Sequence, residues 1–102
     1  FEYGKISNNE DVDKIIKLYK EKYYNENDDK QMWFDKIKDL AEECGYAREV
    51  KEFKANPEKW SAHVGDVSTV LRVKITGRQN TPDLYEIMNV LGKDEVKRRL
   101  NK

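Results

Sequence analysis

The fold depends most on residues 65–92, which read GDVSTVLRVKITGRQNTPDLYEIMNVLG. This stretch joins an apolar run, a polar turn that contains glycine, and a second apolar run. Arg72 and Arg78 bracket the last part of the first run. Thr81 and Pro82 open the second run. Cationic donors therefore meet a proline-stiffened backbone at one turn, which makes this turn the candidate functional site.

The first apolar run is compatible with two structures. Leu71, Val73 and Ile75 alternate with polar residues, and the β-branched content favours a half-buried strand. One helical face also collects apolar residues of the same region: Val64, Val67, Leu71 and Ile75. A glycine after the run could end such a helix. The pattern alone leaves strand and helix open.

The second run has the features of a helix. Thr81 is a suitable N-cap, Pro82 suits the first helical position, and Asp83 favours the positive end of the helix dipole. Apolar residues then recur at helical spacing: Leu84, Ile87, Met88 and Leu91. Gly92 is predicted to end this helix. A last short helix, from Asp94 to about Asn101, is expected to turn two side chains inward: Val96 and Leu100.

Two longer amphipathic helices are predicted upstream. The first follows Asn8 and Asn9, ends near Tyr24, and carries an apolar stripe at spacings typical of a helix: Val12, Ile15, Ile16, Tyr19 and Tyr23. The second runs from about Asp29 to Cys44, with Gly45 as its cap. Its apolar face is continuous: Trp33, Phe34, Ile37, Leu40, Ala41 and Cys44. The aromatic residues on this face are expected in the core.

The segment 46–62 allows two interpretations, a short helix or a partly extended connector. Within it, residues 56–60 are expected to form one capped helical turn that begins at Pro57. His63 is the only histidine, so it has no second ligand or nucleophile nearby in the sequence. We expect it to be a structural or capping side chain.

Composition is consistent with one small domain. A chain of 102 residues should have a radius of gyration near ~13 Å. Lys+Arg 20 balances Asp+Glu 20, but residues 1–62 carry a net charge of −3 and residues 63–102 a net charge of +3. Four of the five arginines lie in the basic part: Arg72, Arg78, Arg98 and Arg99. Because charged faces are usually only solvated, this asymmetry suggests a polyanion surface without establishing one.

Several protein classes are disfavoured. The single cysteine, Cys44, excludes an intrachain disulfide and fits a reducing cytosol. No apolar run approaches ~18 residues and no signal-peptide core is present, so we expect no membrane span and no secretion. The chain begins at Phe1 without an initiator methionine, which suggests an excised piece of a longer protein.

The sequence carries no catalytic or metal-binding motif. There is no Cys/His cluster for zinc, no glycine-rich phosphate loop, and no Ser or Cys with a histidine base at a known spacing. Acid pairs such as Glu42-Glu43 and Asp94-Glu95 are expected on exposed surfaces of so charged a protein. The residues predict a small helical binding domain with a basic, arginine-bearing end, and neither a catalytic nor a metal site.

A longer pattern resembles a known family. Its C-terminal blocks are His63–Val67, Val70–Val73, Ile75–Met88 and Val90–Lys93. Its upstream blocks are Trp33–Lys38, Ala41–Glu42, Gly45–Ala47, Glu49–Glu52 and Asn56–Pro57. Together they resemble the C-terminal anticodon-binding end of bacterial glutamyl-tRNA synthetase, a class I aminoacyl-tRNA synthetase. The match runs from about Asp29 to the C-terminus, whereas residues 1–24 agree only in general character.

The resemblance implies an all-α fold, a small helical bundle or cage of about five helices that receives the tRNA anticodon loop. It also implies a helix over roughly residues 64–76. We expect one domain over residues 1–102, in three parts. Residues 1–28 form an N-terminal helix and loop, residues 29–62 an aromatic helix and connector, and residues 63–102 the anticodon-contacting helices.

The resemblance also implies the anticodon-binding residues: Arg72, Thr81, Pro82 and Leu84. The guanidinium of Arg72 would bond to or stack on an unstacked base, backbone groups at the Thr81 turn would read a base edge, and Leu84 would form an apolar wall beneath a base. Without RNA, Arg72 could pair instead with Asp66 or Glu86, and the Thr-Pro pair would be only a helix start. Exposed cations are candidates for tRNA phosphate contacts: Arg78, Lys93, Lys97, Arg98 and Arg99.

The parent enzyme that the resemblance implies is a cytoplasmic ligase of protein biosynthesis, which joins glutamate to tRNA with ATP through a glutamyl-adenylate. This chain carries no nucleotide-binding fold and no class I signature motif. We therefore expect it to bind RNA without catalysis and without a cofactor of its own. The expected partners are glutamate-accepting tRNA and the rest of the synthetase, with glutamine tRNA left open, and no membrane and no DNA. Two alternatives stay open: a stand-alone helical adaptor that binds protein, and a small DNA-binding helical domain.

Overall fold

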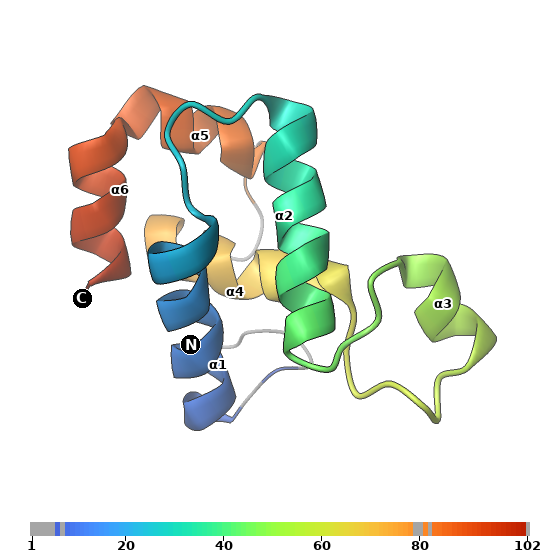
Figure 1. Ribbon diagram of the computed structural model, residues 1–102. Helices are drawn as coiled ribbons and strands as arrows, with labels where there is room; N and C mark the ends of the chain where they lie inside the picture. The colour runs from blue at the N-terminus through green and yellow to red at the C-terminus, as the bar shows by residue number, and fades with distance from the viewer. Residues whose placement is uncertain (1–5, 7, 79–80, 82, 102) are drawn as a thin grey trace.

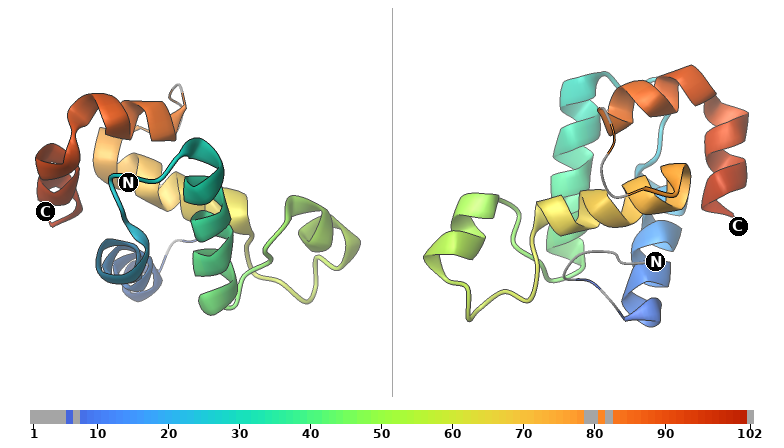
Figure 2. Two further views of the ribbon diagram at one scale, coloured as in Figure 1. Left: turned by 45° about the horizontal axis from the view of Figure 1, so that its top comes forward. Right: turned by 180° about the vertical axis from the view of Figure 1, so that it is seen from behind.

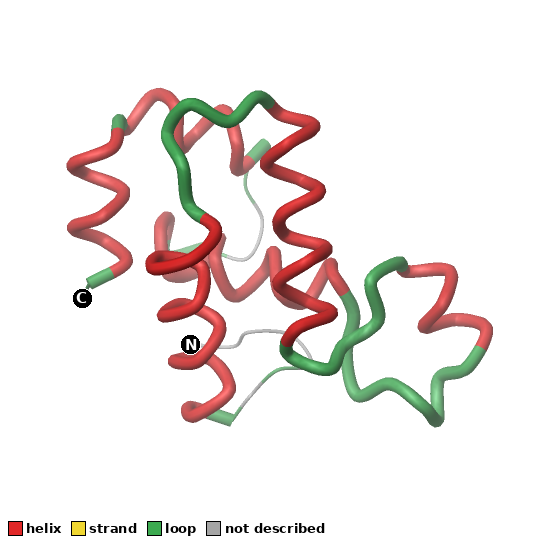
Figure 3. The backbone as a smooth tube through the Cα atoms, in the orientation of Figure 1, coloured by secondary structure: helices red, strands yellow, loops and turns green. Residues whose placement is uncertain are grey.

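The computed structural model describes residues 6, 8–78, 81 and 83–101 of the 102-residue chain. Over these residues the chain forms six α-helices and one π-helical turn, η1 (Figure 1). Their bounds are α1 Asn9–Leu18, η1 Tyr19–Tyr23, α2 Lys30–Glu43, α3 Val50–Ala55, α4 Val64–Thr76, α5 Leu84–Leu91 and α6 Lys93–Leu100. The described residues contain no strand, as Figure 3 shows, so the all-α prediction is confirmed.

Helix α4 occupies the centre of the arrangement and packs against α1, α2 and α6 (Figures 1 and 2). Its first turn is closed by a capping box, in which the His63 Nδ1 atom accepts from the Gly65 amide at 2.9 Å and Asp66 accepts from the His63 amide at 3.1 Å. Gly77, at φ 75°, ends the helix. The choice of helix over strand and the capping role of His63 are both confirmed.

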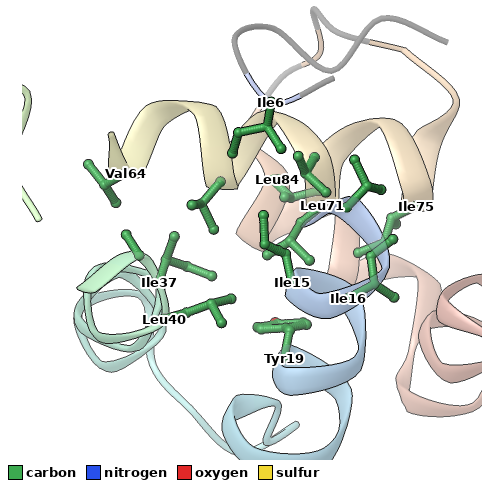
Figure 4. Packing of buried hydrophobic residues seen from close by; sticks show 14 of the residues in the cluster. Ile6, Ile15, Ile16, Tyr19, Ile37, Leu40, Val64, Leu71, Ile75 and Leu84 are labelled. Atoms are coloured by element: carbon green, nitrogen blue, oxygen red, sulfur yellow. The ribbon is translucent and has the colours of Figure 1, made fainter. Parts of the chain in front are cut away.

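One apolar core lies between the helices, and Figure 4 shows side chains of α1, α2, α4 and α5 converging on it. Its fully buried members include Ile15, Ile37, Leu40 and Leu71. Helix α4 contributes buried side chains on several sides and has little polar surface. It is therefore a core helix. The radius of gyration is 12.9 Å, in agreement with the expectation for a single small domain.

The N-terminal helix matches its prediction except at its end. Asn8 is the N-cap, and its side chain accepts from the Glu10 amide at 2.7 Å. The last turn widens into η1, where the Tyr24 amide bonds to the Tyr19 carbonyl at 2.7 Å. The Tyr19 side chain is 1% exposed, and its hydroxyl accepts from Trp33 Nε1 at 3.1 Å. The spacing of apolar residues did not predict the π-helical turn.

Helix α2 is confirmed with Asp29 as N-cap and Gly45, at φ 83°, just past its end. The prediction that every residue of its apolar face is buried is wrong for one residue. Phe34 is 41% exposed, and the Lys38 ammonium lies 4.7 Å from the centre of its ring. The buried face follows the i, i+4, i+7 and i+8 positions from Trp33, so Phe34 lies beside this stripe rather than on it.

Residues 48–62 project from the rest of the chain and contain α3 (Figures 1 and 2). The base of the projection is closed by two backbone hydrogen bonds of 3.0 Å, from the Ala47 amide to Ala62 and from the Val64 amide to Ala47. The short-helix interpretation is thus correct for part of this segment. The helical turn expected at Pro57 is wrong, because residues 57–59 form only a hydrogen-bonded turn.

Helix α5 begins later than predicted. Asp83, not Thr81, is its N-cap, and its side chain accepts from the Tyr85 amide at 3.0 Å. Pro82 lies outside the described residues. Gly92, at φ 83°, ends α5, and α6 follows at once with Val96 and Leu100 buried as expected: 0% and 3% exposed. None of the described helices has the length and apolar content to cross a bilayer.

Candidate RNA-binding site

Arg72 lies on α4 between two buried neighbours, Leu71 and Val73, and is itself half-buried. Its Nε atom is buried and has no hydrogen-bond partner. A buried donor left unpaired costs about 1–3 kcal/mol, so this nitrogen gains from a partner that the chain does not supply. Because the nitrogen is buried, a ligand could bond to it only after the Arg72 side chain moves.

The two internal partners considered for Arg72 do not hold it. Asp66 accepts from the His63 backbone and lies 3.6 Å from the His63 Nε2 atom, at the opposite end of α4. Among the described residues, neither Asp66 nor Glu86 forms an ion pair with Arg72. The ion-pair alternative for Arg72 is therefore not what the structure shows.

The end of α4 is organised around Thr76. Its hydroxyl donates to the Arg72 carbonyl at 2.7 Å and accepts from the Arg78 amide at 3.1 Å. The Gly77 amide bonds to the Val73 carbonyl at 2.7 Å. These bonds set Arg78 just beyond the helix, where its side chain is exposed. Arg72 and Arg78 thus lie on one continuous hydrogen-bonded turn.

Leu84 does not form an exposed wall. Its side chain is 1% exposed and belongs to the core cluster, part of which Figure 4 shows. Contact with a base through this side chain would require the core to open, which is costly. Thr81 is half-buried. Leu84 is best understood as the anchor of this loop.

Asp83, the N-cap of α5, also forms an ion pair with Lys30 at the start of α2. The hydrogen bond from Lys30 and then the Tyr85 amide lower the pKa of the Asp83 carboxyl. Tyr85 adds a longer connection, because its hydroxyl donates to the Asp28 carbonyl at 2.7 Å. Sequence spacing could not reveal these contacts, which join segments far apart in the chain.

The five phosphate-contact candidates fall into two groups. Lys93 pairs with Glu26 at 3.3 Å, and Arg98 forms a two-bond fork with Glu95 at 2.9 and 2.5 Å. Arg99 also belongs to the paired group, because it forms an ion pair with Glu95. In contrast, Lys97 and Arg78 are exposed, and neither side chain has a partner within the described residues. These two cations are the ones most available to a polyanion.

Arg99 is engaged on both sides of its guanidinium. Its Nε atom donates to Glu95 at 2.6 Å, and its Nη1 atom donates to the Ile75 carbonyl at 2.8 Å. Hydrogen bonds from Arg98 and then Arg99 lower the pKa of the Glu95 carboxyl to about 2. The Glu95–Arg99 spacing could have indicated a pair along one helix. Nothing in the sequence indicated the bond to α4.

The described residues contain no group of three or more His, Cys, Asp or Glu side chains that could hold a metal ion.

Comparison with known proteins defines the class to which this fold and site belong. Residues 16–102 match the family model described as an anticodon binding domain. The chain belongs to this family. No solved structure gives a significant match.

The curated relatives are glutamate–tRNA ligases. The protein from Acetivibrio thermocellus is 47% identical over 93 residues, which cover 91% of this chain and 17% of the relative. That from Sorangium cellulosum is 53% identical over 73 residues, 72% of this chain and 13% of the relative. That from Clostridium perfringens strain SM101 is 45% identical over 93 residues, again 91% and 17%. The resemblance to the anticodon-binding part of this synthetase is confirmed, and the chain spans less than a fifth of these relatives.

Proposed function

We propose that this chain binds the anticodon loop of a glutamate-accepting tRNA and so positions that tRNA for ATP-dependent glutamylation by the other parts of a glutamate–tRNA ligase. Membership of the anticodon-binding family supports the RNA partner. The relatives, all of them glutamate–tRNA ligases, support the amino acid. The observation that carries the site is the buried, unpaired Nε atom of Arg72.

The physics of anticodon recognition suits such a donor. Anticodon bases are unstacked in the loop, so their edges and faces are open to a planar guanidinium. Arg72 is half-buried, and a donor in a partly shielded site makes a stronger bond to a base than a fully exposed donor does. Arg72 would therefore supply the base contact, with the backbone near Thr81 and Pro82 beside it.

Phosphate contacts would come from the candidate cations that have no side-chain partner among the described residues. Arg78 and Lys97 have no partner within the described residues, so they can bind phosphate without breaking an ion pair. Lys93 and Arg98 would first have to leave Glu26 and Glu95. Leu84 would act through packing, by holding the loop against the core.

The central test is the affinity of Arg72→Ala for an RNA anticodon stem-loop, measured by fluorescence anisotropy at fixed salt. A base contact of about 1–3 kcal/mol predicts a loss of affinity between about fivefold and about 150-fold. Arg48→Ala is the matched control, because it removes an equal charge from an arginine paired with Asp39. Equal losses for both variants, or a parallel loss of helical content in Arg72→Ala, would overturn the proposal.

Two further measurements check its limits. Duplex DNA should compete poorly with the stem-loop, because binding through phosphates alone shows no preference and a steep salt dependence. The chain mixed with ATP and glutamate should form no adenylate, since the resemblance assigns that chemistry to other parts of the ligase. Adenylate formation would contradict the non-catalytic role.

A protein-binding adaptor is the second candidate, favoured by the outer face of α5. There Val90 is 86% exposed beside an apolar hollow of about 250 Å³. Asp83 and Glu86 border this hollow, and their charge opposes phosphate. This candidate gains if the chain ignores the stem-loop while Val90→Glu abolishes binding to a protein partner.

A further inference from the structure

The last turn of α4 receives a hydrogen bond from a distant helix. The final carbonyls of an α-helix have no partner within the helix and need one from elsewhere. Here the Ile75 carbonyl is bound by the Arg99 Nη1 atom of α6 at 2.8 Å, across a separation of 24 residues. Arg99 therefore closes an end of α4 that the helix cannot close by itself.

Arg99 is held in place for this contact. Its Nε atom donates to Glu95 at 2.6 Å, one turn earlier on α6. One guanidinium thus joins a carboxylate of its own helix to a carbonyl of α4 through two different nitrogens, whereas lysine would have to reach both acceptors from a single nitrogen. The pair is partly shielded, with side-chain exposures of 33% for Arg99 and 28% for Glu95.

The bound carbonyl lies at the candidate site. Ile75 is one helical turn after Arg72 and directly precedes Thr76, whose hydroxyl connects the Arg72 carbonyl to the Arg78 amide. If this turn became flexible, the positions of Arg72 and Arg78 would change with it. The bond from Arg99 to the turn therefore affects the positions of these two arginines.

We propose that Arg99 is a positioning residue for RNA binding, which holds the Ile75 carbonyl and thereby fixes the turn that carries Arg72 and Arg78. This inference rests on the proposed function of the chain, and it removes Arg99 from the phosphate-contact candidates. Arg98 provides the comparison, because it binds the same Glu95 carboxylate with a side chain that is 57% exposed, and among the described residues it makes no bond to α4.

The first test needs no RNA. Amide hydrogen exchange of Gly77 and Arg78 is measured in the 102-residue chain and in Arg99→Ala, with Arg98→Ala as the control of equal charge. Faster exchange of these two amides in Arg99→Ala alone is the expected result, because the last turn of α4 would open locally. Equal exchange in the two variants would overturn the inference.

The second test uses the anticodon stem-loop. Arg99→Ala should weaken binding by about tenfold and Arg98→Ala by about twofold or less, since only the first leaves a carbonyl unpaired at the site. Arg99→Lys, which keeps the charge but loses the fork, should resemble Arg99→Ala. A phosphate contact would instead let lysine restore binding and would lower the salt slope by about one unit in Arg99→Ala. Either of those outcomes would overturn the positioning role.

A double-mutant cycle separates this inference from the proposed function. If Arg99 acts through the α4 turn, its effect should be non-additive with Arg72→Ala, whereas the effect of Arg98→Ala should add. Additive effects for Arg99 would contradict the inference. An Arg72→Ala variant that binds as well as the unaltered chain would contradict the proposed function, and the RNA-free exchange experiment would still decide what Arg99 does.

Discussion

The two ends of α4 are closed in different ways. The N-terminal end is self-contained, because His63 and Asp66 cap it within a few residues of sequence. The C-terminal end depends on Gly77, on Thr76 and on Arg99 from another helix. Local caps stabilise a helix wherever it lies, whereas a long-range cap ties the helix end to tertiary structure. The candidate site lies at the end that depends on tertiary structure.

The loop beyond that end has its own anchor, and removing it should have the largest effect. Leu84→Ala deletes a core side chain that is 1% exposed. Large-to-small core substitutions of this kind cost about 2–5 kcal/mol of unfolding free energy. Urea denaturation measures this loss.

The same variant separates packing from base contact at Leu84. If Leu84 acts only as an anchor, the fraction of Leu84→Ala that remains folded should bind the stem-loop with no more than a modest loss. A small loss of stability with a large loss of affinity would show that its side chain touches RNA and would restore the apolar-wall role.

Gly77→Ala should have the next largest effect, at the C-terminal end of α4. The added Cβ meets nothing within 4 Å, so the cost comes from the backbone at φ 75° and should be about 1–2 kcal/mol. RNA affinity should fall as well, because the strain is relieved by moving the turn that carries Arg78. Thermal denaturation and stem-loop titration measure the two losses. Unchanged RNA affinity would mean that the C-terminal end of α4 does not contribute to RNA binding.

Asp66→Ala tests the other end and should have a smaller, different effect. Loss of this capping side chain should cost about 1 kcal/mol of stability. Affinity for the stem-loop, measured where the variant is fully folded, should stay the same because the cap lies far along α4 from Arg72. If Asp66→Ala weakened RNA binding as much as Gly77→Ala, the contrast between the two ends would be lost.

The same contrast explains how much of the fold could be predicted. Local rules identified α2, its Asp29 and Gly45 boundaries, and the His63 cap. They could do so because a helix cap and the spacing of apolar residues each depend on residues close together in the sequence. The choice between strand and helix for α4 needed the family resemblance. Its buried residues face several neighbours, so they satisfy both periodicities, and only the packing of surrounding helices decides.

Wrong predictions arose where two residues could fill one local role. Thr81 and Asp83 are both good N-caps, and tertiary contact with Lys30 favoured the second. Phe34 lies beside the apolar stripe of α2, and its ring contacts the Lys38 side chain rather than packing in the core. The residues within α5 and α2 themselves do not indicate which N-cap is used or where the Phe34 ring lies.

The residues of the candidate site stay a prediction from the resemblance, which gave no information on the contacts that surround them. The resemblance pointed to Arg72, and the structure adds its unpaired nitrogen. The same resemblance pointed to Leu84, yet the side chain proved to be core. The bond between Arg99 and Ile75 exists only because α4 and α6 lie together, which no sequence window of helical length contains.

The smallest expected effect is that of acid on the Arg99 contact. Hydrogen bonds from Arg98 and Arg99 place the pKa of Glu95 at about 2, below the ~4.3 of an unperturbed glutamate. A carboxyl whose pKa is lowered by folding contributes its stabilisation above the unfolded value and loses it as the pH falls through the folded one. The contact should therefore be complete at neutral pH and weaken only between about pH 4 and 2.

Amide chemical shifts of Gly77 and Arg78, followed from neutral pH to pH 2, would report this change. Glu95→Gln is the matched control, because it removes the titrating group while Asp83, whose pKa is also lowered, stays in place. A titration step that survives in Glu95→Gln would belong to Asp83 or another carboxyl. A step near pH 4 in the unaltered chain would mean that the two arginines do not hold Glu95 strongly, and the C-terminal end of α4 would then rest on Gly77 and Thr76 alone.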